Sequence, residues 1–114
     1  MRILVAGAGQ IGAKILLQLK KNPNIKVLTV DPRIEPYAVR EGIVSHIDFH
    51  EALTPIALES VINKAKPDLV LLTTSTEDMD LGKPPGIDVF VEGLREEIAA
   101  TSKVPIIAVA RTAK

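Results

Sequence analysis

Residues 7–12 read Gly-Ala-Gly-Gln-Ile-Gly, a complete G-x-G-x-x-G pattern. The pattern directly follows an apolar run and opens a stretch with helical spacing, which is the context in which it binds a pyrophosphate. We expect Gly7 to permit a tight turn and Gly9 to let a phosphate approach the backbone. We expect Gly12 to let the following helix pack closely against a sheet. This segment therefore predicts a phosphate-binding loop.

An acidic residue follows at the distance that a dinucleotide site needs. Asp31 ends the next apolar run, about 20 residues after the glycines, where a carboxylate can accept hydrogen bonds from the adenosine ribose. The amides around Gln10 and Ile11 would meet the pyrophosphate at the positive end of the helix dipole. A negative charge at Asp31 repels the 2′-phosphate of NADP, so NAD(H) is favoured over NADP(H). Arg33 either softens that preference or is an ordinary surface arginine.

Hydroxyl side chains end a later apolar run and complete the predicted site. Thr73, Thr74 and Ser75 would lie beside the same crevice, where they could bond a ribose or a phosphate or cap the strand's backbone. The predicted cofactor-binding residues are Gly7, Gly9, Gln10, Ile11, Gly12, Asp31, Arg33, Thr73, Thr74 and Ser75. In the alternative interpretation the glycines serve only a strand-to-helix turn and Asp31 caps the turn that follows.

Other polar residues offer weaker chemistry. His46, Asp48 and His50 form a His-x-Asp-x-His pattern that could orient a base or hold a metal, or Asp48 could merely cap a turn. Ser45, Ser75 and Ser102 lack the context of a nucleophile elbow. We therefore expect no catalytic residue and no metal site in this chain.

The elements that must position these residues follow from hydrophobic spacing. Continuous apolar runs indicate strands covered on both faces, and apolar residues three or four apart indicate helices. The expected strands cover residues 2–6, 25–30, 43–47, 68–73 and 104–109, and the expected helices cover 11–21, 35–41, 55–65 and 87–101. Their alternation predicts a three-layer α/β fold with an open parallel sheet of about five strands in the order 3-2-1-4-5. The long connection at 74–86 leaves the carboxyl edge, either as a lid or as a plain surface loop.

Composition narrows the class of protein. The chain has 114 residues, 46% of them hydrophobic, which suffices for a single domain over residues 1–114. Fourteen basic and 14 acidic residues balance, so the basic field of a nucleic-acid-binding protein is missing. Without cysteine there are no disulfides or thiolate sites. With neither a signal peptide nor a run of about 20 apolar residues, we expect a cytoplasmic protein with no direct membrane insertion.

Residues 2–31 resemble the NAD-binding Rossmann superfamily. The early glycine motif and the acid ending the second strand are similar to the nucleotide-binding domain of RCK/Trk-type regulators of potassium transport. That resemblance implies a bound nucleotide used as a signal. The chain departs from these regulators because Ile47, not glycine, precedes Asp48. The glycine motif is also similar, more weakly, to that of lactate/malate and saccharopine-type dehydrogenases. The resemblance to lactate/malate dehydrogenases rests in addition on the Lys-Pro-Pro-Gly sequence of residues 83–86.

Three functions remain open at this point. The first is a regulatory or sensing module that binds NAD(H) or another adenine nucleotide. The second is the cofactor-binding domain of an NAD-dependent oxidoreductase, completed by a partner protein or a missing domain. The third is a Rossmann-like scaffold without nucleotide binding. The helix at 87–98 and the edge strand at 104–109 further predict a homodimer.

Overall fold

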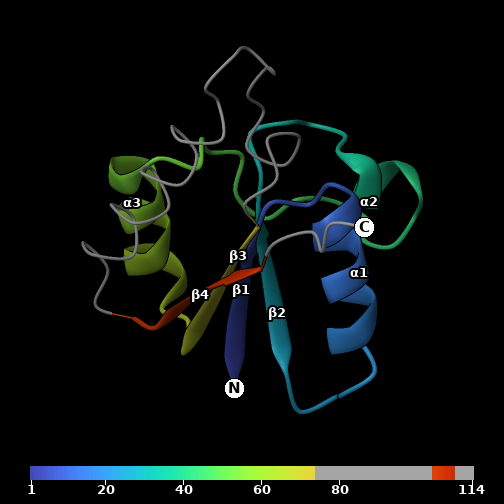
Figure 1. Cartoon of the computed structure of the whole chain (residues 1–114), viewed down its shortest axis with the longest axis horizontal. Helices are drawn as coiled ribbons and strands as arrows, with labels where there is room; N and C mark the ends of the chain where they lie inside the picture. The colour runs from blue at the N-terminus through green and yellow to red at the C-terminus, as the bar shows by residue number, and fades with distance from the viewer. Residues whose placement is uncertain (74–103, 110–114) are drawn as a thin grey trace.

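Strands and helices alternate along the computed structural model, which describes residues 1–73 and 104–109 (Figure 1). The elements are β1 (Arg2–Ala6), α1 (Gln10–Leu19), β2 (Lys26–Val30), α2 (Tyr37–Arg40), α3 (Pro55–Ala65), β3 (Leu69–Thr73) and β4 (Ile106–Val109). Their bounds lie within two residues of the expected ones. The expected helix at 87–101 and the connection at 74–86 lie outside the described residues.

The strands form a parallel sheet in the order β2-β1-β3-β4. In β1, Ile3 pairs with Val27 of β2 on one side and with Leu69 of β3 on the other. β4 is the last described strand at its edge of the sheet, and Ile107 there is half exposed. The homodimer predicted through this region stays a prediction.

Helices cover both faces of the sheet, with α1 and α2 on one side and α3 on the other (Figure 1). Because successive side chains of a strand point to opposite faces, β1 serves both layers. Ile3 and Val5 pack in the core cluster that contains residues of α1 and α2, whereas Leu4 packs in the cluster that contains residues of α3. The three-layer arrangement was predicted, and it is compatible with a Rossmann-like domain.

The prediction of a strand at residues 43–47 is wrong. Residues 43–46 form bends, and among the described residues only a parallel bridge between Val30 and Phe49 continues the sheet beyond β2. The Asp48 carboxylate accepts the Thr29 amide at 2.9 Å, so a side chain takes the place of the backbone carbonyl that a strand would offer. The described sheet therefore has four strands. Once the strand at 43–47 is left out of the expected order 3-2-1-4-5, the remaining order is the observed one.

Helix α3 begins at Pro55, where the sequence predicted its start. Thr54 is the N-cap, and its Oγ1 atom accepts a hydrogen bond from the Ala57 amide at 3.3 Å. Pro55, at the first position, has no amide hydrogen to leave unpaired. The helix ends at Ala65, and its C-cap, Lys66, adopts a left-handed conformation with φ of 51°. In the part of the chain described here, no helix has the length and apolarity needed to cross a membrane.

Candidate functional site

The glycine loop connects the carboxyl end of β1 to α1 through a tight turn. Gly7 has a φ of +102°, a conformation that side chains disfavour, and its amide donates to the Val30 carbonyl at 2.8 Å. A Cβ atom on Gly12 would lie 1.9 Å from the Gly7 carbonyl oxygen. Only a glycine at position 12 lets α1 approach this closely. The turn and packing roles predicted for these two glycines are confirmed.

The first turn of α1 has no cap from a side chain. Gly9 is the N-cap with extended backbone angles, and no acidic residue stands in the first turn. The first helical hydrogen bond runs from the Ala13 amide to the Gly9 carbonyl at 2.8 Å. The amides of residues 9–12 make no hydrogen bond to any residue within 1–73 or 104–109. Unbonded amides at the positive end of a helix are suited to an anion.

Asp31 lies next to this loop and is completely buried. Its Oδ2 atom accepts the Ala8 amide at 2.7 Å and Nη2 of Arg33 at 2.7 Å. Its Oδ1 atom accepts the Arg33 amide at 2.8 Å and Nε of Arg33 at 2.9 Å. A carboxylate offers about four lone-pair sites, and four donors already occupy them. A ribose hydroxyl could therefore bond to Asp31 only after Arg33 had moved.

Arg33 thus forms a bidentate ion pair with Asp31, which sequence reasoning had not foreseen. The Arg33 side chain is 22% exposed, while the Asp31 side chain is fully buried. The two residues are separated only by Pro32, so the turn after β2 brings them together. Arg–carboxylate pairs of this geometry are strong and directional. The pair fixes the backbone around Asp31 and holds a positive group beside the glycine loop.

Thr73 is the remaining predicted site residue within the described part. It is fully buried at the end of β3, and its hydroxyl donates to the Ala6 carbonyl at 3.1 Å. Its Cγ2 atom is 3.9 Å from the position of a Cβ built on Gly12. The structure therefore brings Thr73 to the glycine loop and uses its hydroxyl to cap the backbone of β1. Thr74 and Ser75 lie outside the described residues.

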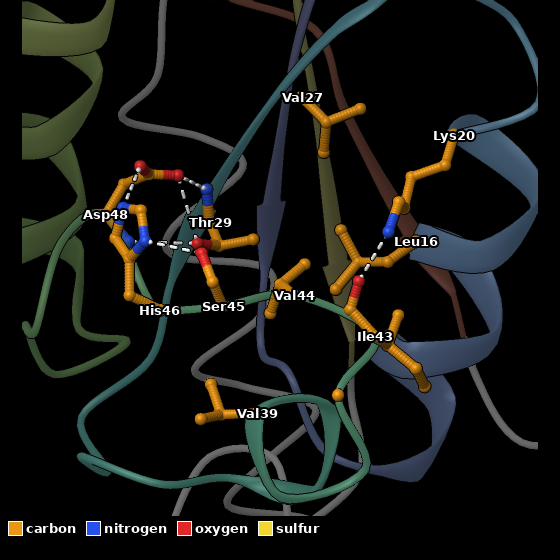
Figure 2. A pocket seen from close by; sticks show the side chains of 11 residues that line it. Leu16, Lys20, Val27, Thr29, Val39, Ile43, Val44, Ser45, His46 and Asp48 are labelled. Carbon is orange, nitrogen blue, oxygen red and sulfur yellow. Dashed lines mark hydrogen bonds and ion pairs between the residues drawn. The ribbon is translucent and has the colours of Figure 1, made fainter.

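A separate pocket of about 740 Å³ lies between α1, β2 and the segment 39–48 (Figure 2). Ser45 Oγ lies 3.0 Å from Nδ1 of His46, and Nε2 of His46 lies 3.5 Å from Oδ1 of Asp48. Ser45 has no nucleophile-elbow context, and its position directly before His46 is the one sequence signal for this contact. Among residues 1–73 and 104–109, no group of three potential ligands could hold a metal ion.

Comparison with known proteins gives one partial similarity. No protein-family model matches the chain, and no solved structure matches it significantly. A formate-dependent phosphoribosylglycinamide formyltransferase of Marinobacter nauticus is 30% identical over 70 residues. The similar region covers 61% of this chain but only 17% of that protein. The chain thus spans about a sixth of its relative's length.

Proposed function

We propose that this chain is a nucleotide-binding domain whose glycine loop holds a phosphate of the ligand. The observation that carries the proposal is the set of amides at residues 9–12, which no described residue bonds. They stand at the carboxyl edge of a parallel sheet, where open α/β folds bind their ligands. The N-terminus of α1 has no acidic residue that would neutralise it, so the helix dipole favours an anion there.

The ligand we propose carries a ribose phosphate. The name of the relative in Marinobacter nauticus specifies a phosphoribosyl compound, and ribonucleotides also contain a ribose phosphate. NAD(H) is the particular ligand that the glycine motif favours. Its adenosine ribose can reach Asp31 only if Arg33 releases a carboxylate oxygen. We propose that binding serves regulation, with the cofactor domain of an oxidoreductase as the alternative.

Isothermal titration calorimetry tests this proposal. The panel contains NAD⁺, NADH, NADP⁺, NADPH, ATP, ADP, AMP and ribose 5-phosphate, with adenosine as the control that lacks phosphate. We expect at least one phosphorylated compound to bind and adenosine not to bind. Failure of every phosphorylated compound would support the scaffold interpretation. Steady hydride transfer from a small hydroxy or amino acid to NAD⁺ would support the oxidoreductase alternative instead.

A charge placed at the start of α1 locates the site. Gln10 is exposed at the first helical position, and Gln18 is exposed near the other end of the same helix. Gln10→Glu should weaken binding of a phosphorylated ligand about tenfold, because the new carboxylate repels the phosphate. Gln18→Glu makes the same change of charge away from the loop and should leave affinity unchanged. Equal affinities of the two variants would contradict a phosphate site at the glycine loop.

A further inference from the structure

The pocket beside β2 exists because residues 43–47 do not pair with that strand. Its walls come from α1, from β2 and from the segment that bends away, and its volume of about 740 Å³ is typical of small-molecule sites. Leu16, Val27, Val39 and Val44 supply much of the lining. A pocket so lined is suited to a short aliphatic group.

Polar groups gather along one wall of this pocket (Figure 2). The imidazole of His46 is in contact with the Ser45 hydroxyl through Nδ1 and with the Asp48 carboxylate through Nε2. A hydroxyl within hydrogen-bond reach of a base, with the base oriented by a third group, is the arrangement that activates a nucleophile. Ser45, His46 and Asp48 are near neighbours in the sequence. The bends in the chain around them bring their side chains into contact.

Asp48 is held in place by β2. Its Oδ2 atom accepts the amide of Thr29 at 2.9 Å and the hydroxyl of Thr29 at 3.1 Å. The Asp48 amide donates back to the Thr29 hydroxyl at 3.0 Å. These bonds leave Oδ1 facing His46, where it favours a proton on Nε2. The lone pair of Nδ1 then points to Ser45, as a general base requires.

We propose that Ser45 is the nucleophile of an acyl-transfer site that accepts esters of short aliphatic acids. Ser45 Oγ attacks the ester carbonyl carbon while Nδ1 of His46 takes the hydroxyl proton. The bond from that carbon to the alcohol oxygen breaks, and the alcohol leaves with the proton from His46. Water then attacks the acyl-serine carbonyl carbon and gives a proton to His46. The bond from that carbon to Ser45 Oγ breaks, His46 returns the proton to Ser45 Oγ, and the acid is released. Asp48 is a positioning residue for the imidazole.

The exposure of His46 sets the expected rate. Its side chain is 72% exposed, so surrounding water competes with the substrate for the imidazole. A general base of this kind contributes roughly 10²-fold to 10⁴-fold, and we expect the lower end of that range. Activated esters and fluorophosphonates are therefore the appropriate probes, because their leaving groups need little assistance.

The test is covalent labelling of the whole chain with a fluorophosphonate, followed by peptide mass mapping. Attack by Ser45 forms an oxygen–phosphorus bond and expels fluoride. Ser60, exposed on α3, is the matched control. We expect one adduct, on Ser45, which Ser45→Ala abolishes and Ser60→Ala leaves intact. His46→Gln should slow labelling at least tenfold, because glutamine cannot take the proton, and hydrolysis of p-nitrophenyl butyrate should fall in parallel.

The variant Asp48→Asn distinguishes a role of Asp48 in positioning the His46 imidazole from a role in stabilising the fold. The asparagine oxygen can still accept from Thr29, so the melting temperature should stay close to that of the parent chain. The maximal labelling rate at saturating probe should fall several-fold while the probe concentration for half-maximal rate stays unchanged. The proposal is overturned by an absence of adduct on Ser45, by similar labelling of Ser60, or by an unchanged rate in His46→Gln. An equal loss of melting temperature and labelling in Asp48→Asn would overturn its positioning role.

Discussion

The carboxylate of Asp31 joins the end of β2 to the glycine loop, since its Oδ2 atom accepts the Ala8 amide at 2.7 Å. The residues stand at the ends of neighbouring parallel strands, and both are fully buried. Arg33 fills the remaining acceptor positions of the carboxylate. Asp31 therefore determines the shape of the loop that would hold a phosphate, whether or not it also contacts a ligand.

Asp31→Ala should lower the free energy of unfolding by about 3 kcal/mol. The substitution leaves the buried Ala8 amide without an acceptor and removes the ion pair between Arg33 and the Asp31 carboxylate. Urea denaturation followed by circular dichroism measures the change. Glu35→Ala, at an exposed position shortly after Asp31, is the control and should shift stability by less than about 0.5 kcal/mol. A parent-like midpoint for Asp31→Ala would show that these hydrogen bonds contribute nothing net.

Two glycines should respond differently to alanine. In Gly12→Ala the new Cβ would lie 1.9 Å from the Gly7 carbonyl oxygen, so the backbone must move and we expect loss of the cooperative thermal transition. Gly42 has a φ of +74° with open space around it, so Gly42→Ala should cost only about 1 kcal/mol of strain. Differential scanning calorimetry compares the two. A Gly12→Ala variant as stable as Gly42→Ala would contradict the close approach of α1 to the loop.

The hydroxyl of Thr29 should stabilise the segment that replaces the expected strand. Thr29 is buried, and its hydroxyl exchanges two hydrogen bonds with Asp48. Thr29→Val removes both and should lower the free energy of unfolding by about 2 kcal/mol, mainly because the part-buried Asp48 amide loses its acceptor. Thr29→Ser keeps the hydroxyl and should cost less. Hydrogen exchange at the Asp48 amide should accelerate in the valine variant alone, and an equal acceleration in both variants would speak against the bond.

Local signals predicted most of the described elements. Continuous apolar runs located β1 and β3 because a parallel sheet buries both faces of its strands. Thr54 and the proline after it located the start of α3 because capping is a contact within one turn. The segment 43–47 has the same apolar character, and there the prediction failed. A polar side chain from Asp48 competes with the backbone for the edge of β2, and hydrophobic spacing does not register that competition.

The sequence by itself determined the positions where the chain must turn or pack closely, because Gly7 and Gly12 act through their own backbone and lack of a side chain. Only the tertiary structure decided what the polar side chains do. Asp31 turns inward to Ala8 and Arg33, and His46 meets both of its neighbours along a pocket wall. A carboxylate or imidazole interacts with whichever polar groups lie within hydrogen-bond or ion-pair distance. Those distances are set by the packing of distant elements.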